Sequence, residues 1–152
     1  MEQTFFNYNL KPHLAIDDYF VGNSNMKSYN ILIKNNDCNN NFFLYGPNKS
    51  GKTHLSLIWK KKFNALKYNN NLHEIINTKR NVLIDDIFNN INEEDIFHLI
   101  NHCNLNQIKL LVTSHISLNE YFFKFKDLSS RLKTFIHIQI DLPDDELLMN
   151  LM

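Results

Sequence analysis

The stretch GPNKSGKT (46–53) combines residue types and a spacing that suit the binding of phosphate groups. It fits the pattern G-x-x-x-x-G-K-[ST], in which backbone N–H groups surround phosphate oxygens. Lys52 takes the place of the lysine that reaches the β and γ phosphates, and Thr53 that of the hydroxyl that contacts Mg²⁺. The loop and the residue after it predict a site for a nucleotide with Mg²⁺, formed by Gly46, Pro47, Asn48, Lys49, Ser50, Gly51, Lys52, Thr53 and His54.

Lys49 is the unusual residue of this loop. It stands where a glycine would be easier to accommodate, in a chain that has only three glycines. We expect its side chain to point outward or toward the phosphates, where it weakens the loop without abolishing it. The alternative interpretation of the whole stretch is a glycine turn that binds no ligand.

Two adjacent carboxylates, Asp85 and Asp86, close the apolar run NVLIDDI (81–87). An acid at the end of a strand beside a phosphate loop can hold the Mg²⁺ shell, and the next acid can polarise the water that attacks the γ-phosphate. In isolation such a pair merely ends a strand. The loop upstream favours the functional interpretation, with Asp85 as the Mg²⁺ residue and Asp86 as the catalytic one.

A third group of polar residues follows the apolar run of LLVTSH (110–115). A polar side chain at the tip of the neighbouring strand can touch both the γ-phosphate and the attacking water. Thr113 is the first candidate for this catalytic position, and Ser114 and His115 stay open beside it.

Arg131 is the fourth candidate and lies in DLSSRL (127–132), which reads as a short helix. An arginine presented across a subunit interface stabilises transition-state charge on a phosphate, so Arg131 would act in trans. The plainer alternative is an ion pair with Asp127 one helical turn away.

Alternating strands and helices are predicted to position these residues. FFLY (42–45) ends at the glycine loop and predicts a buried strand, and helical spacing then predicts a helix from the loop to about residue 66. Three more apolar runs, 81–87, 108–114 and 135–140, predict further strands. The pattern predicts a parallel sheet covered on both sides, with ligands beyond the carboxyl ends of its strands.

Two other helices are expected. One covers about 25–35, with Asn23 or Ser24 as its cap. The other begins at Asn92, since an amide side chain at that position can cap a helix whose first turn is acidic. Its predicted core face consists of Ile96, Phe97, Leu99, Ile100 and Cys103.

Length and composition indicate a single globular domain. The chain has 152 residues, of which 43% are hydrophobic and 21% charged. The formal net charge is +0, which argues against a domain that holds nucleic acid mainly through bulk charge. For the basic cluster Lys60, Lys61 and Lys62 a solvated helix face is the favoured interpretation.

The sequence shows no pattern typical of a metal site, a disulfide framework or a membrane segment. Cys38 and Cys103 make neither a metal spacing nor a disulfide framework. The N-terminus has no basic region followed by an apolar run, and no apolar stretch approaches the ~18 residues of a membrane span. We therefore expect a cytoplasmic protein with no membrane partner.

Four stretches together resemble the core of AAA+ ATPases of the bacterial initiator clade. They correspond to its Walker A, Walker B, sensor 1 and arginine-finger motifs, and they are GKTHL (51–55), VLIDDI (82–87), VTSH (112–115) and DLSSRL (127–132). An aspartate at position 86 is also typical of this clade. The best match is the Hda group, the DnaA-homologous regulatory inactivators, since DDYFVGNSNMKSYNILI (17–33) resembles their entry segment and LPDDELL (142–148) their exit from the last strand.

The resemblance implies an α/β fold with a five-stranded parallel sheet between helices. It implies that ATP or ADP binds with Mg²⁺, and that intrinsic ATPase activity is weak or absent. It also implies partners: the initiator DnaA, whose ATP hydrolysis would be stimulated through Arg131, and the DNA polymerase sliding clamp. The chain would contact DNA only indirectly, through the clamp. Self-association of the chain is a further expectation.

The resemblance also divides the chain into an arm (1–22), an AAA+ core (23–143) and the start of a missing or truncated helical lid (144–152). The arm begins QTFF, a glutamine followed by aromatics as in short clamp-binding peptides. We expect Gln3, Phe5 and Phe6 to bind the clamp; alternatively, the phenylalanines pack onto the domain's own core.

Three other functions stay open. The chain can be a DnaA-like ATPase domain or a helicase-loader ATPase, which shares GKTHL (51–55). It can also be an interaction module that keeps the fold but binds no nucleotide. Nucleotide titration separates this last alternative from the others.

Overall fold

The computed structural model describes residues 25–34 and 41–142. The predicted arm with its clamp-binding peptide and the predicted start of a lid helix lie outside the described residues. Asn23 and Ser24, the predicted caps of the first helix, also lie outside them.

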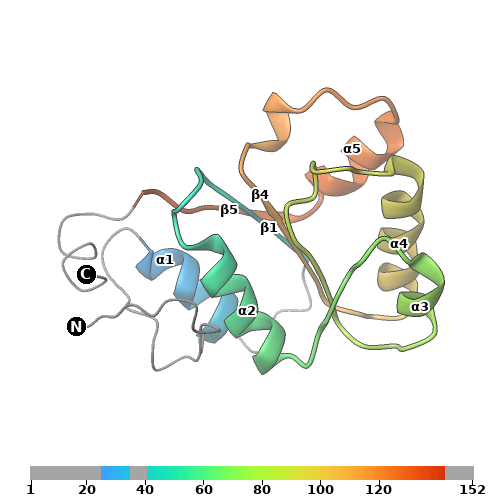
Figure 1. The fold of residues 1–152 in the computed structure, drawn as a ribbon, viewed down its shortest axis with the longest axis horizontal. Coiled ribbons are helices and arrows are strands. Elements are labelled where there is room, and N and C mark those ends of the chain that lie inside the picture. Colours follow the sequence, from blue (N-terminus) through green and yellow to red (C-terminus); the bar gives the residue numbers. More distant parts are fainter. Residues whose placement is uncertain (1–24, 35–40, 143–152) are drawn as a thin grey trace.

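Five parallel strands form one sheet, as predicted, in the spatial order β2-β3-β4-β1-β5 (Figure 1). Four of them coincide with the predicted apolar runs. The fifth, β2, has only two residues, which is too short for a periodic pattern. The strands are β1 (Phe42–Tyr45), β2 (Leu66–Lys67), β3 (Val82–Ile84), β4 (Leu110–Ser114) and β5 (Ile136–Gln139).

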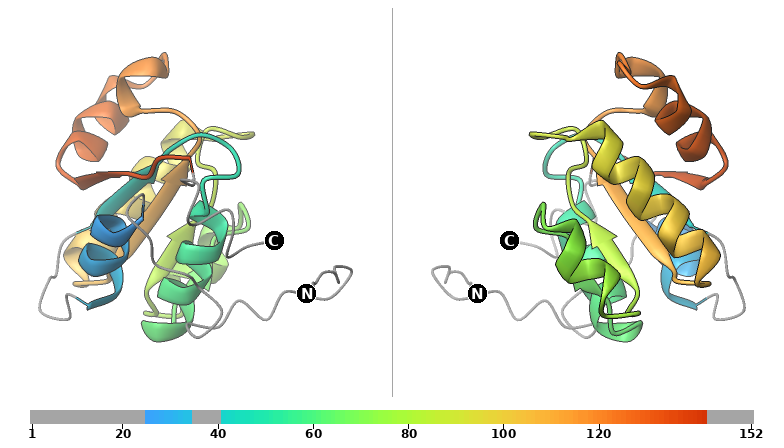
Figure 2. Two further views of the ribbon diagram at one scale, coloured as in Figure 1. Left: turned by 90° about the vertical axis from the view of Figure 1, so that its left-hand side faces the viewer. Right: turned by 90° about the vertical axis from the view of Figure 1, so that its right-hand side faces the viewer.

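Helices cover both faces of this sheet and give the molecule three layers (Figure 2). The α-helix α1 continues into the π-helical turn η2, and together they match the helix expected over 25–35; they lie with α2 on one face. Helices α3, α4 and α5 pack on the other face, with the 3₁₀ turn η3 before α5. The bounds are α1 (Met26–Tyr29), η2 (Asn30–Lys34), α2 (Lys52–Lys62), α3 (Leu72–Ile76), α4 (Glu93–Leu105), η3 (Leu118–Glu120) and α5 (Lys126–Lys133).

Alternate residues of each strand supply two separate cores. On β1, Phe43 packs in the cluster below α4 and α5, whereas Phe42 and Leu44 pack in the cluster below α2. Trp59 of α2 is fully buried in the second cluster. Burial on both faces explains why the strands read as continuous apolar runs rather than alternating ones.

Helix α2 ends earlier than the apolar spacing predicts. It stops at Lys62 instead of about residue 66, and Asn64 takes a left-handed backbone conformation with φ 53°. Leu66 then pairs with Val82 across β2 and β3. Leu66 is apolar because it belongs to the sheet, and its spacing from the helix residues is coincidental.

Strand β3 is also shorter than predicted. It ends at Ile84, so Asp85 and Asp86 follow the strand instead of lying within it. Asp86 has φ 50°, which turns the chain out of the extended conformation. The backbone N–H of Ile87 still donates to the carbonyl of Thr113 at 2.9 Å, so the segment stays beside β4.

Helix α4 begins as predicted. The Asn92 side chain accepts a hydrogen bond from the backbone N–H of Asp95 at 3.2 Å, which satisfies one free donor of the first turn. Phe97, which was predicted to belong to the core face, is only partly buried. Cys103 is buried, and its burial raises the pKa of the thiol to about 12. The fully buried face of the helix is Ile96, Leu99, Ile100 and Cys103.

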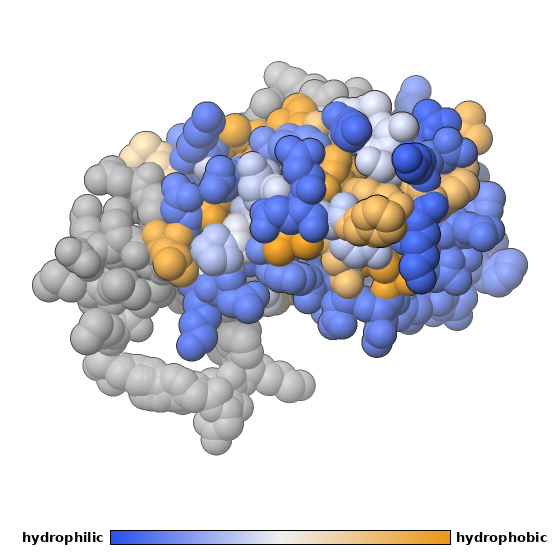
Figure 3. Space-filling view, turned by 90° about the horizontal axis from the view of Figure 1, so that it is seen from above, coloured by the Kyte–Doolittle hydropathy of each residue, from blue (hydrophilic) through white to orange (hydrophobic). Residues whose placement is uncertain are grey.

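Few large apolar side chains are exposed on the described part of the chain: Met26, Leu105, Phe122 and Leu142. On the face seen from above, apolar residues form separate patches among hydrophilic ones (Figure 3). Within the described ranges no helix has the length and apolar character that a membrane span requires.

Candidate functional site

The register of the sheet brings the predicted site residues to one edge. Ile84 lies opposite Val112 in the β3–β4 pair, so Asp85, the next residue, comes level with Thr113. Tyr45 lies opposite Ser114 in the β1–β4 pair, so the phosphate loop begins at the same edge. Parallel strands align their carboxyl ends, and this alignment assembles groups that are far apart in the sequence.

Two glycines shape the loop between β1 and α2. A β-carbon on Gly46 would lie 2.1 Å from the carbonyl oxygen of Ile140, a distance that no side chain tolerates. Gly51 has φ 98°, in the left-handed region that glycine adopts without strain. Gly46 therefore permits the close approach of Ile140, the residue after β5, and Gly51 permits the turn into α2.

Lys49 also takes a left-handed conformation, with φ 67°. The expectation that glycine would fit this position more easily is therefore confirmed. A left-handed conformation costs a residue with a side chain about 1–2 kcal/mol. The loop carries this strain at a residue that lines the cavity beside Lys52.

Lys52 extends over the loop that precedes it. Its Nζ donates to the carbonyl oxygens of Gly46 at 2.6 Å and Pro47 at 2.8 Å, and to Ser50 Oγ at 3.4 Å. Burial lowers the pKa of this ammonium, and the Asp86 and Asp85 carboxylates partly offset the effect. The ammonium thus lies at the mouth of the loop, facing two carboxylates.

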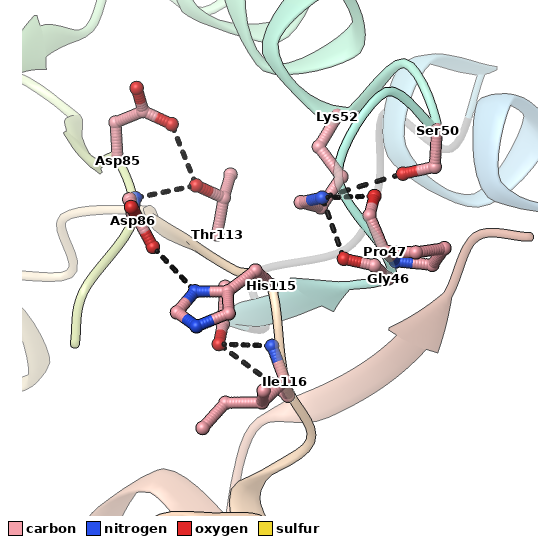
Figure 4. A network of polar contacts seen from close by, with 10 residues as sticks. Gly46, Pro47, Ser50, Lys52, Asp85, Asp86, Thr113, His115 and Ile116 are labelled. Atoms are coloured by element: carbon pink, nitrogen blue, oxygen red, sulfur yellow. Dashed lines mark hydrogen bonds and ion pairs between the residues drawn. The ribbon is translucent and has the colours of Figure 1, made fainter. Parts of the chain in front are cut away.

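The acidic residues form a connected network with the end of β4 (Figure 4). Thr113 Oγ1 donates to Asp85 Oδ1 at 2.7 Å and accepts from the backbone N–H of Asp86 at 2.8 Å. His115 Nδ1 lies 3.1 Å from Asp86 Oδ1. Asp85 Oδ2 also lies 3.5 Å from Lys67 Nζ, and no sequence motif predicts this ion pair.

One cavity of about 390 Å³ joins the two halves of the site. Gly46, Pro47 and Ser50 are not among the residues that line it; they contact Lys52 from the loop side. His54 lies in the first turn of α2, outside this lining. The cavity is lined by Asn48, Lys49, Gly51, Lys52, Thr53, Asp85, Asp86, Thr113 and His115.

The three candidates at the end of β4 differ in position. Thr113 is buried and bound to both acidic positions. Ser114 Oγ turns away and donates to the carbonyl of Ile116 at 2.7 Å. His115 is exposed, unlike Thr113 and Ser114, and contacts Asp86 alone. Thr113 and His115 line the cavity, whereas Ser114 does not.

Arg131 lies on α5, away from this cavity. Its guanidinium is exposed and lies 5.7 Å from the centre of the Phe97 ring on α4. Among the described residues no ion pair joins it to Asp127, so the helical pair considered from the sequence is not formed. A separate cavity of about 490 Å³ is lined by Phe97, Asp127, Ser130, Arg131 and Thr134.

Several solved structures share this fold, whereas no family model and no curated protein matches the chain. AMPPCP-bound DnaA from Aquifex aeolicus has a TM-score of 0.78 at 18% identity, over 93% of this chain and 54% of that one. Domain III of DnaA from Thermotoga maritima has a TM-score of 0.74 at 20% identity, over 91% of this chain and 71% of that one. A putative primosome component from Streptococcus pyogenes has 0.66 at 14%, over 86% of both chains.

The chain thus spans about half of the length of the nucleotide-bound DnaA structure. At these identities the likeness shows the fold alone, which is a five-stranded parallel sheet between helices. The chain has the α/β fold of the AAA+ NTPases, in the form seen in the DnaA structures.

Proposed function

We propose that this chain binds ATP or ADP in the cavity between the phosphate loop and the end of β4. The observation that carries the proposal is the convergence of Lys52, Thr53, Asp85 and Thr113 on one cavity. The first N–H groups of α2 have no partner within the helix, and its positive dipole end faces the same space. These groups together suit the charge and the oxygen atoms of a polyphosphate.

Mg²⁺ would be bound with the nucleotide rather than before it. In the described ranges no three His, Cys, Asp or Glu side chains cluster as a metal site. Thr53 and Asp85 both line the cavity, and both offer the oxygen ligands that Mg²⁺ prefers. Phosphate oxygens and water would supply the rest of the coordination shell.

We further propose that the chain is an Hda-type regulator that stimulates ATP hydrolysis by the initiator DnaA. The position of Arg131 supports an action in trans, since this exposed guanidinium lies outside the cavity of its own chain. A partner that docks its nucleotide against α5 would receive the arginine beside its γ-phosphate. The sliding clamp enters the proposal through the sequence QTFF, with Gln3, Phe5 and Phe6 as the binding residues.

The experiment is a hydrolysis assay with the cognate initiator, clamp and DNA, comparing wild type with Arg131→Ala. Arginines supplied in trans change phosphoryl-transfer rates by about 10³–10⁵ in well-studied cases, so stimulation should be lost. Nucleotide affinity and circular dichroism of the variant should match wild type. Lys133→Ala, which removes another exposed cation from α5, should stimulate normally.

Unchanged stimulation by Arg131→Ala would reject the role of the arginine finger. A variant that unfolds is replaced by Arg131→Lys, which keeps the charge but loses the planar fork. Omitting the clamp, or deleting residues 1–8, should remove the stimulation if the clamp recruits this chain.

A helicase-loader role is the second candidate. The Streptococcus pyogenes primosome component matches 86% of this chain with 86% of its own, so the two chains correspond over most of their lengths. A loader binds the replicative helicase, whereas the proposed regulator acts on the initiator. Capture of the purified helicase, with no effect on the initiator's hydrolysis, would favour the loader.

A further inference from the structure

The formal charge of +0 conceals an uneven distribution of charge. Outside residues 25–142 the sequence has a single cation, Lys11, so the remainder of the chain carries an excess of five positive charges. The anions responsible are those of the two ends: Glu2, Asp17, Asp18, Asp144, Asp145 and Glu146.

The described acidic residues concentrate toward the carboxyl edge of the sheet, where the nucleotide cavity lies. Asp85 and Asp86 follow β3, and Asp141 follows β5. The other described acidic residues lie in the first turns of helices that begin at this edge, where the positive end of the helix dipole stabilises a carboxylate. These first-turn residues are Glu74, Glu93, Glu94, Asp95, Glu120 and Asp127.

Basic residues gather at the opposite, amino edge of the sheet. They come from three separate segments: the last turn of α2, the connection into β3 and the residue before β4. In Figure 1 the end of α2 and the connections that enter β3 and β4 lie together at the lower side of the molecule. We call this the amino-edge surface: Lys60, Lys61, Lys62, Lys79, Arg80 and Lys109.

Neutral groups join these segments. Lys109 Nζ lies 4.3 Å and Lys62 Nζ 5.7 Å from the centre of the Phe63 ring. Arg80 Nε donates to the Asn64 carbonyl at 3.1 Å, and its Nη2 donates to Asn64 Oδ1 at 3.0 Å. The backbone N–H of Lys109 donates to Asn81 Oδ1 at 2.8 Å.

These contacts hold Lys62, Arg80 and Lys109 in place without neutralising them. Lys62 Nζ also donates to the carbonyl of Ile33, another neutral acceptor. Within the described residues no carboxylate pairs with any cation of the amino-edge surface. Like charges on one surface repel one another, and a bound anion would relieve that repulsion.

We propose that the amino-edge surface binds the phosphate backbone of a nucleic acid without reading its bases. Six cations at one edge of the sheet, three of them held by neutral groups, suit a ligand that carries many negative charges. Amide side chains able to bind phosphate and sugar oxygens flank them at Asn64, Asn106 and Gln107, all exposed. A lipid surface fits less well, because Leu105 is the single large exposed apolar side chain among the described residues around this edge.

This nucleic-acid site lies at the opposite ends of the strands from the nucleotide cavity, and it does not depend on the function proposed for that cavity. A protein that acts on an initiator at DNA would gain a second, direct contact with DNA. Binding should be independent of sequence and of adenine nucleotide, and weakened by salt.

The test uses the full chain and fluorescence anisotropy with labelled duplex DNA and a single strand, at several salt concentrations. The variant is Lys61→Gln with Lys79→Asn, since both lysines are exposed and Asn tolerates the left-handed φ of 56° at position 79. The slope of log affinity against log salt should fall by about 1 for each lysine removed. At low salt the affinity should fall roughly tenfold or more.

The matched control is Lys124→Gln with Lys126→Gln, which removes the same charge from exposed residues near the carboxyl edge. It should keep the wild-type slope and affinity. Equal losses in the two variants would indicate bulk charge only and overturn the proposal. So would unchanged DNA binding in the first variant, or lysine-dependent binding to phosphatidylserine vesicles with none to DNA. If the double variant fails to fold, Lys61→Gln alone should lower the slope by about 1.

Discussion

At the scale of the residue, the site depends on side chains whose positions are fixed by a few short contacts. Thr113 connects Asp85 and Asp86, so the two carboxylates keep different environments although they are neighbours in sequence. Both carboxylates line the cavity, but Asp85 accepts from the Thr113 hydroxyl and lies beside Lys67, whereas Asp86 contacts His115. This difference suits one carboxylate to the metal and the other to the attacking water.

Lys52→Ala should weaken ATP and ADP binding by about 10- to 100-fold, as expected for the loss of charged hydrogen bonds to phosphate. The matched control is Lys61→Ala, which removes a lysine from the other end of α2. Isothermal titration calorimetry with Mg²⁺ measures both variants. Equal affinities of Lys52→Ala and wild type would contradict the phosphate-loop assignment.

At the scale of the element, one carboxylate connects α4 to the segment that leads into α5. Glu93 accepts from the backbone N–H groups of Phe125 at 2.8 Å and Lys124 at 3.2 Å, and from the Tyr121 hydroxyl at 3.5 Å. Burial, together with the Glu93 charge, raises the pKa of the Tyr121 hydroxyl. The first turn of α4 thereby positions the start of the helix that carries Arg131.

Glu93→Gln should lower the free energy of unfolding by about 1–2 kcal/mol, since hydrogen bonds to a charged acceptor are weakened. Glu94→Gln is the matched control, because Glu94 is exposed and takes part in no hydrogen bond among the described residues. Urea denaturation measures the difference, and hydrogen exchange of residues 121–125 locates it. Equal stability of the two variants would refute the role of Glu93 in holding this segment.

At the scale of the whole molecule, the three layers separate two surfaces. The carboxyl edge of the sheet holds the cavity and most of the described acidic residues, whereas the amino edge holds the basic cluster. The two hydrophobic cores, one on each face of the sheet, lie between these edges. A ligand in the cavity contacts the loop before α2 and the ends of β3 and β4, so its binding should stabilise the domain as a unit.

ATP or ADP with Mg²⁺ should therefore raise the melting temperature of the domain. At a ligand concentration of 100 times the dissociation constant the stabilisation is about 2.7 kcal/mol, which corresponds to several degrees for a domain of this size. Differential scanning calorimetry measures the shift. Lys52→Ala should abolish it, and a chelator should reduce it. No shift in wild type at millimolar nucleotide would favour the interaction module that binds no nucleotide.

Sequence patterns alone predict the phosphate loop, the acidic pair, four of the five strands and the start of α4 at Asn92. These features are local: a loop spacing, an apolar run or a cap depends on residues that are neighbours in the chain. The misplaced end of α2 shows the limit, because Leu66 is apolar through its partner Val82 in another strand.

Which distant groups meet depends on how the strands pair and the helices pack. The pairing of β3 with β4 placed Thr113 between the two aspartates, and the packing of α4 against α5 put Phe97 beside Arg131 in place of the helical pair. Folding likewise joined three basic segments into one surface that a net charge of +0 does not reveal. Net charge sums the chain, whereas binding depends on where charges lie in space.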